Sequence, residues 1–188
     1  MDKRIIKTER AFARALFHFL NEKELNKITV KELCEYAEMN RGTFYLHYID
    51  IYDLMDKVEQ QMVDRIYIEG NSERRPINDS ILKVFDYIKL HKEEYKTLLV
   101  KHLRFGFINK LSDKILSESM PFMEKVIPNV NEETVKNASY FYVGGAVALL
   151  HGWLENDCAI PCEELLSASL LMADYVYETR IKNDLTEL

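Results

Sequence analysis

Apolar residues recur along this chain at the three- and four-residue spacing of helices that pack one face against a core. The spacing predicts a first helix from Thr8 to about Glu22, with a polar connector, Asn21 to Lys27, at its end. Later segments with the same spacing predict helices over 51–68, 78–90, 92–100, 103–127, 131–156 and 161–182. Nothing predicts a strand, so the expected fold class is all-α with about nine helices.

Prolines and polar residues separate these segments. The stretch 69–77, EGNSERRPI, is the clearest predicted loop. Pro121 falls inside the 103–127 segment and predicts a kink or a restart there, because proline removes a helical hydrogen bond. Pro128 predicts the end of that helix, and Asn131 is a strong residue type for capping the next one.

Between Thr29 and Tyr48 the pattern predicts two short helices joined by a tight turn. Thr29 and Glu32 fit a capping box, in which each side chain accepts from the other residue's backbone N–H. Asn40 is the predicted N-cap of the second helix. Because only about three residues separate the helices, they must cross steeply. This is the helix-turn-helix layout, in which the second helix lies in the major groove of DNA.

The second helix needs apolar anchors on its inner side, and Phe44 and Tyr48 supply them. Arginine pairs with guanine, and threonine offers a methyl or a hydroxyl to a base edge. Tyrosine and histidine are better suited to phosphates, which position the protein without specifying sequence. The candidates for the outer side are Arg41, Thr43, Tyr45 and His47, and Gly42 permits close approach of the backbone. The alternative is a short surface helix with a few polar groups.

The same stretch resembles the DNA-binding domain of the TetR/AcrR family of transcriptional regulators. The matching residues are Thr29-Val30 at the first helix start, Leu33-Cys34 with Ala37 in its core, and Gly42-Thr43-Phe44-Tyr45 with Tyr48. The resemblance implies a three-helix DNA-binding domain over residues 1–50, linked by the helix 51–68. It also implies a larger helical domain over residues 51–188 for effector binding and dimerisation. The expected DNA-contacting residues are Thr29, Asn40, Arg41, Gly42, Thr43, Tyr45, His47 and Tyr52.

Two positions depart from the family pattern. Glu38 occupies a turn position that is usually glycine; a left-handed backbone there costs a non-glycine residue on the order of 1 kcal/mol, unless the turn changes its geometry. Ile51 occupies a position where the family usually has a phosphate-binding lysine, and Tyr52 is the proposed substitute. One phosphate contact is therefore expected to be lost.

In the later part, the family resemblance implies that the last two long helices dimerise. The run 143–148, VGGAVA, contains adjacent glycines that each cost about 1 kcal/mol inside a helix, which close packing would offset. Packing within the subunit is the alternative. The segment 151–165 resembles a subgroup that includes the activator of a dihydroxyacetone kinase operon. The expected interface residues are Tyr140, Gly144, Val147, Ala148, His151, Leu165, Met172 and Val176.

Aromatic residues are dense between 85 and 107, which suits an apolar pocket for a small organic effector. The candidate ligand-binding residues are Phe85, Tyr87, Tyr95, His102 and Phe105. Aromatics at helical spacing also form ordinary cores, and a regulator without an effector is the other possibility.

The formal net charge of −6 is unusual for a DNA-binding protein, but the charge is unevenly distributed. Residues 1–48 hold nine Lys/Arg against seven Asp/Glu, whereas the remainder holds sixteen against twenty-four. The acidity therefore lies outside the predicted DNA-binding part. Lys3, Arg4 and Lys7 are expected to form a basic arm ahead of the first helix.

No apolar run approaches the ~20 residues of a membrane span, and the first residues lack a signal peptide, so we expect a cytoplasmic protein with no membrane partner. Three cysteines fit a reducing compartment. Cys34 is expected in the core; Cys158 and Cys162 are expected to be ordinary thiols, with a redox or metal pair as the alternative. We expect no cofactor and no metal.

No phosphate-binding glycine loop, His-x-x-x-His pair or nucleophile elbow occurs, so we expect no enzymatic activity. The predicted function is a homodimeric transcriptional regulator that binds a palindromic double-stranded DNA operator. We expect it to be a ligand-responsive repressor. The alternative is a transcriptional co-activator or a helical protein-interaction module without a small-molecule effector.

Overall fold

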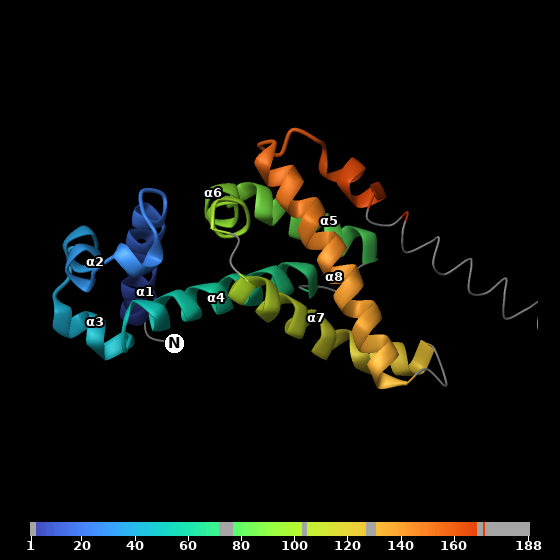
Figure 1. Ribbon diagram of the computed structural model, residues 1–188, viewed down its shortest axis with the longest axis horizontal. Coiled ribbons are helices and arrows are strands. Elements are labelled where there is room, and N and C mark those ends of the chain that lie inside the picture. The colour runs from blue at the N-terminus through green and yellow to red at the C-terminus, as the bar shows by residue number, and fades with distance from the viewer. Residues whose placement is uncertain (1–2, 72–76, 103–104, 127–130, 169–170, 172–188) are drawn as a thin grey trace, which may run out of the picture.

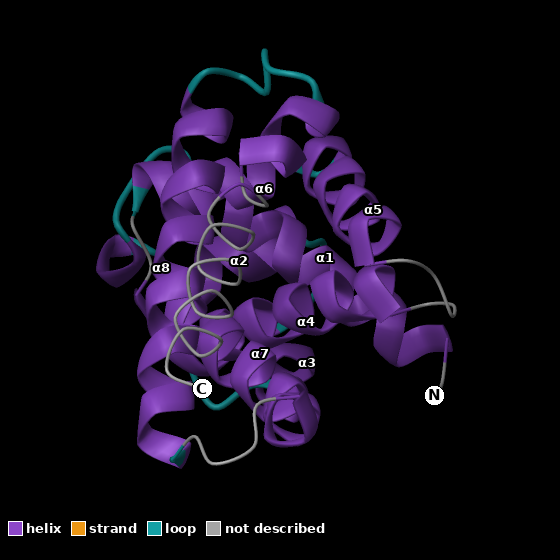
Figure 2. Cartoon of the chain, turned by 90° about the vertical axis from the view of Figure 1, so that its right-hand side faces the viewer, coloured by secondary structure: helices purple, strands orange, loops and turns teal. Residues whose placement is uncertain are grey.

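The computed structural model describes residues 3–71, 77–102, 105–126, 131–168 and 171. Across these residues the chain is helical and no strand is present, which confirms the all-α prediction (Figures 1 and 2). The first three helices form a small unit at one end of the molecule, and α4 leads from it into the larger helical part (Figure 1).

The small unit consists of α1 (Lys3–Leu20), the short 3₁₀ helix η1 (Leu25–Lys27), α2 (Val30–Tyr36) and α3 (Arg41–His47). The predicted start of α1 at Thr8 is wrong, because the helix begins at Lys3 and the Thr8 hydroxyl donates back to the Arg4 carbonyl at 3.0 Å. The buried side of α1 begins only at Ala11, so the apolar pattern could not reveal the first two turns. The expected basic arm is thus the first part of α1.

An aromatic cluster holds the small unit together. Phe12 from α1 meets Phe44 from α3 edge to face, with ring centroids 5.3 Å apart, and meets Tyr48 at 5.9 Å. Phe12 and Phe44 are fully buried, and Leu16 and Leu33 close the same core. Aromatic pairs in this arrangement add stabilisation beyond the burial of their area. The inward anchors predicted for α3 are confirmed as core residues.

The larger part begins with α4 (Ile51–Asn71), which extends three residues past the predicted end at Ile68. It is followed by α5 (Ile77–Leu90), and then by α6 (Lys92–Lys96), which continues into the π-helical segment η2 (Thr97–Lys101). The predicted loop over 69–77 is therefore shorter than expected, and its centre lies outside the described residues.

The long helices α7 (Phe105–Val126) and α8 (Glu132–Glu155) follow. Helix α7 continues across Pro121 without a restart. Asn131 caps α8 by accepting from the Thr134 backbone N–H at 2.7 Å, as predicted. The last predicted helix is described over 162–168 and at residue 171; its remainder lies outside the described residues.

A partly buried ion pair connects α4 to α7. Glu59 is only 2% exposed, and its carboxylate lies 2.9 Å from the Lys110 ammonium, which also lies 2.6 Å from Asp56. A Cβ added to Gly106 would lie 2.8 Å from Glu59 Oε2, so the start of α7 packs directly against this carboxylate. An ion pair thus connects α4, which follows the small unit, to α7 in the larger part.

Cys34, Cys158 and Cys162 are buried free thiols, and burial raises their pKa values. Within the described residues, no group of three or more His, Cys, Asp or Glu side chains is arranged to hold a metal ion. No described helix is both long and apolar enough to cross a membrane.

Candidate nucleic-acid interface

The start of α2 is the capping box expected from the sequence. The Thr29 backbone N–H donates to Glu32 Oε2 at 2.9 Å, and the Glu32 backbone N–H donates to Thr29 Oγ1 at 3.3 Å. Lys23 donates to the other Glu32 oxygen at 2.6 Å. The Lys23 hydrogen bond, followed by those from Thr29, lowers the pKa of Glu32 to about 2. Glu32 therefore stays ionised, and holds the helix start, throughout the neutral range.

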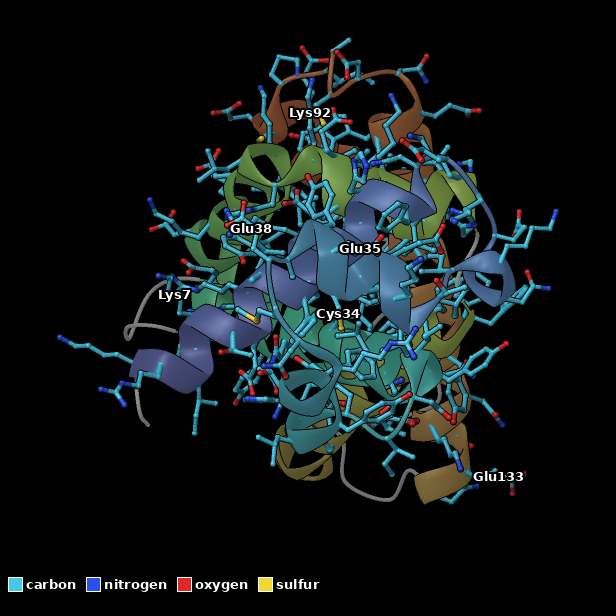
Figure 3. The ribbon with its side chains drawn as sticks, turned by 90° about the vertical axis from the view of Figure 1, so that its left-hand side faces the viewer. Lys7, Cys34, Glu35, Glu38, Lys92 and Glu133 are labelled. Atoms are coloured by element: carbon cyan, nitrogen blue, oxygen red, sulfur yellow. The ribbon has the colours of Figure 1, made fainter. Side chains whose placement is uncertain are left out.

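The turn between α2 and α3 keeps a left-handed residue although glycine is absent. Glu38 has φ 54°, and Met39 N–H donates to the Cys34 carbonyl at 2.9 Å while Glu38 N–H donates to Glu35 at 3.3 Å. These two bonds are those of a Schellman motif. The turn has not changed its geometry to suit Glu38, so the expected cost, on the order of 1 kcal/mol, applies here. Glu35 and Glu38 are exposed on the side viewed in Figure 3.

Asn40 caps α3, as predicted. Its Oδ1 accepts from the Thr43 backbone N–H at 2.8 Å and lies 3.2 Å from the Thr43 hydroxyl. A Cβ at Gly42 would lie 3.1 Å from the same oxygen, closer than most such contacts. Glycine at position 42 therefore leaves room for the Asn40 cap. This structural role is separate from the predicted close approach of the backbone to DNA.

The outer side of α3 is open to solvent. Arg41 and Gly42 are exposed, and Tyr45 is 59% exposed. Sequence reasoning missed Leu46, which is 86% exposed on the same short helix. The signal was available, since Gly42 and Leu46 are four residues apart and lie opposite the buried Phe44 on a helical wheel. On a helix that lies in the major groove, an exposed apolar side chain can contact a thymine methyl group.

The end of α3 and the start of α4 are held by charged side chains. Lys57 donates to the His47 carbonyl at 2.9 Å and to Asp53 at 3.0 Å. Asp53 accepts from the Ile49 N–H at 2.9 Å, and Asp50 accepts from the Asp53 N–H at 2.8 Å. The Ile49 bond, followed by that from Lys57, lowers the pKa of Asp53. The start of α4 is thus negatively charged.

Asp50 and Asp53 flank Ile51, the position where the family usually has a phosphate-binding lysine. Ile51 is half-buried against the core and offers no charge. Tyr52, in the first turn of α4, is 58% exposed. Its role as a phosphate contact stays a prediction, as do those of Thr29 and His47.

The candidate ligand residues are dispersed in the structure. Phe85 and Tyr95 are buried, and the Tyr95 hydroxyl donates to the Met62 carbonyl at 3.3 Å. His102 lies 2.7 Å from the Leu20 carbonyl. Phe105 is 67% exposed. Of the five candidates, Tyr87 and Tyr95 line one groove, which lies against α1.

The candidate dimer residues differ in their exposure to solvent. Tyr140, Gly144 and Ala148 are exposed on one face of α8, and no atom lies within 4 Å of a Cβ added at Gly144 or Gly145. Val147 and Leu165 are buried within the subunit. His151 is half-buried, and Met172 and Val176 lie outside the described residues.

The family model for the C-terminal region of TetR-type transcriptional regulators matches residues 76–174. None of the curated proteins compared with the chain matches it. A TetR transcriptional regulator from Streptococcus agalactiae 2603V has a similar structure, with TM-score 0.68 and 21% identity, over 91% of this chain and 96% of that one.

Two further solved structures resemble the chain at 14% identity. The fatty acid degradation regulator FadR from Bacillus halodurans has TM-score 0.61, over 90% of this chain and 93% of that one. The dihydroxyacetone kinase operon activator DhaS has TM-score 0.56, over 88% and 93%. These likenesses concern the fold, whereas the family match covers more than half of the sequence. The chain belongs to the TetR family of transcriptional regulators.

Proposed function

We propose that this regulator is a homodimeric, ligand-responsive repressor that binds a palindromic DNA operator in the cytoplasm. Residues 1–50 would bind DNA, and residues 51–188 would bind the effector and the second subunit. The observation that carries the proposal is the outer side of α3, where Arg41, Gly42 and Tyr45 are exposed on a helix whose inner side is fixed by Phe44. A helix held in this way presents its polar side to the major groove.

The exposed strip of α8 supports the dimer. Tyr140, Gly144 and Ala148 repeat every four residues, and Phe141 and Gly145 lie beside them, with Phe141 82% exposed. Large contiguous apolar patches on a surface are typical of protein interfaces. A second copy of α8 would cover the strip and approach closely at the glycines, and a two-fold axis there would place two copies of α3 on one operator.

Arg41→Ala and Thr43→Ala should both weaken discrimination between operator sequences. If Arg41 contacts a guanine, its loss should reduce affinity for the operator by about 1–3 kcal/mol and relax specificity at that base pair. The measurement is fluorescence anisotropy with DNA from upstream of the protein's own gene and with a scrambled duplex, at one fixed salt concentration.

Lys83→Ala is the control for the Arg41 experiment, because Lys83 is exposed on α5, outside the small unit that carries α3. It removes the same charge and should leave discrimination unchanged. Unaltered operator affinity and selectivity in both the Arg41 and Thr43 variants would contradict the assignment of α3 as the recognition helix.

Gly144→Leu should shift the protein toward monomer by placing a bulky side chain at the close approach of two α8 helices. Gly144→Ala is the matched control, since it changes helix propensity in the same direction but keeps the residue small. Sedimentation velocity at several concentrations would measure the shift. A dimer of unchanged affinity in the leucine variant would place the interface elsewhere.

The sign of regulation has a second candidate, because one structural relative is named as an operon activator. A transcriptional co-activator, or an interaction module without a small-molecule effector, is the corresponding alternative function. In-vitro transcription from the operator-containing promoter distinguishes the two: a repressor lowers transcript yield, whereas an activator raises it. An effector changes either outcome only if it binds two states of the protein with different affinity.

A further inference from the structure

A groove of about 1020 Å³ lies between the small DNA-binding unit and the larger part. Its walls come from α1 on one side, and from α4, α5 and α6 on the other. In Figure 1, α1 and α6 lie over the same side of α4. Residues of all three helices line the groove. Two candidate ligand residues, Tyr87 and Tyr95, line this groove, and the proposed function does not say which class of ligand it would bind.

One face of α1 supplies cations to the groove. Lys3, Lys7, Arg10 and Arg14 line it at three- and four-residue intervals, and Phe17 continues the same face. This face lies away from the buried side of α1, which packs into the small unit. Residues at this spacing share one side of a helix. Lys3 and Lys7, two of the three residues expected to form a basic arm, therefore lie along one wall with Arg10 and Arg14.

The opposite walls supply an apolar surface and one more cation. Val58, Met62 and Arg65 line the groove from α4 at the same helical spacing. Tyr87 from α5 adds aromatic surface and is half-buried, whereas Tyr95 from α6 lines the groove but is only 1% exposed. Burial raises the pKa of Tyr87, and the positive charge of Arg65 opposes that rise.

The charge in the groove is unbalanced. Arg10, Arg14 and Arg65 form no hydrogen bond or ion pair with other described residues, and they stand on opposite walls. The only carboxylates among the lining residues are those of Glu93 and Glu94, on α6. Arginine forks bind carboxylates and sulfonates in a bidentate manner. We propose that this groove binds an amphipathic organic anion, whose acidic group lies between the arginines and whose apolar body covers Met62 and Tyr87.

Polar contacts at one end of the groove connect it to DNA binding. Asn21, which also lines the groove, accepts from Thr97 Oγ1 at 3.1 Å and from Lys101 Nζ at 2.6 Å. The end of α1 is thereby joined to η2. A ligand that touches both α1 and α4 has an affinity that depends on their spacing, and by reciprocity it changes that spacing. This regulatory step rests on the proposed function, whereas the binding itself does not.

The test uses two fluorescent probes of similar shape. 8-Anilinonaphthalene-1-sulfonate carries an acidic group, and N-phenyl-1-naphthylamine lacks it. Fluorescence titration of the full chain should show tighter binding of the sulfonate. Arg14→Gln and Arg65→Gln should each weaken sulfonate binding about fivefold, as expected for a partly exposed charge-assisted hydrogen bond, and should leave the neutral probe unaffected. Lys83→Gln, which removes an exposed charge outside the groove, should bind both probes as the wild type does.

Sulfonate affinity that is unchanged in both arginine variants, or reduced equally by Lys83→Gln, would overturn the proposal. Operator binding by the same wild-type protein separates the two hypotheses. If the probe binds the groove but no operator is bound, the proposed function fails and the groove stands. If the operator is bound and saturating sulfonate probe lowers its affinity in wild type but not in the double variant R14Q/R65Q, both stand.

Discussion

Phe44→Ala is expected to unfold the DNA-binding unit while leaving much of the helical content of the larger part in place. The Phe44 ring is fully buried and contacts Phe12 and Tyr48, at centroid distances of 5.3 and 5.4 Å. Truncation of a buried phenylalanine typically costs about 3–5 kcal/mol, because it removes apolar burial and leaves a cavity. A unit of this size rarely has more stability than that to lose. Operator binding should disappear with it.

Amide hydrogen exchange at fixed protein concentration would locate the effect. Protection should fall in α1, α2 and α3 and persist in α7 and α8. Tyr45→Ala is the matched control, since Tyr45 follows Phe44 on the same helix but is 59% exposed. It should weaken DNA binding with little loss of protection. Equal protection in wild type and Phe44→Ala would show that the aromatic cluster does not hold the unit together.

Lys110→Met is expected to destabilise the larger part by about 3 kcal/mol, because it removes the ammonium group from a carboxylate that is almost fully buried. Methionine retains most of the apolar stem, so the loss comes mainly from the charge. Burial alone would lower the pKa of Lys110, but hydrogen bonds from its ammonium to Asp56 and Glu59 raise it above the ordinary value. The contribution is therefore fully present below the unfolded-state pKa of about 10.4 and is lost only as the pH rises through the higher folded-state value.

Urea unfolding at pH 7 would measure the effect. The double variant Glu59→Gln/Lys110→Met should recover part of the stability, because it contains neither the buried carboxylate nor the ammonium group. Lys83→Met serves as a surface control and should change the free energy of unfolding by less than about 0.5 kcal/mol. If Lys110→Met were as stable as that control, the ion pair would contribute nothing to the contact between α4 and α7.

The helix-turn-helix was predictable because local interactions determine it. The Thr29 capping box and the Asn40 cap join residues three apart, so the sequence identifies both helix starts. Unlike the two helix caps, the backbone conformation of Glu38 could not be predicted from the sequence. Sequence reasoning could state the cost of a left-handed residue, but only the structure showed that the Schellman bonds are kept and the strain retained.

Other features escaped because no local signal marks them. The first two turns of α1 carry no buried residue, so periodicity placed the start five residues late. Glu59 looks like any surface glutamate in the sequence, and its burial depends on Gly106 and Lys110, about fifty residues away. The candidate ligand residues were chosen for their density along the chain, and the structure separates them, since Phe105 is exposed while Tyr95 is buried.

By itself, the sequence determined that this chain is all-helical, where most helices lie, and where the helix-turn-helix starts its two helices. Those features depend on spacings of three to seven residues, which a reader can follow along the chain. Tertiary structure alone decided that Glu59 is buried against Lys110, and that basic residues of α1 face Arg65 and Tyr87 across a groove. Both depend on how helices far apart in the sequence pack, and a helical pattern records which side of a helix is buried but not which helix covers it.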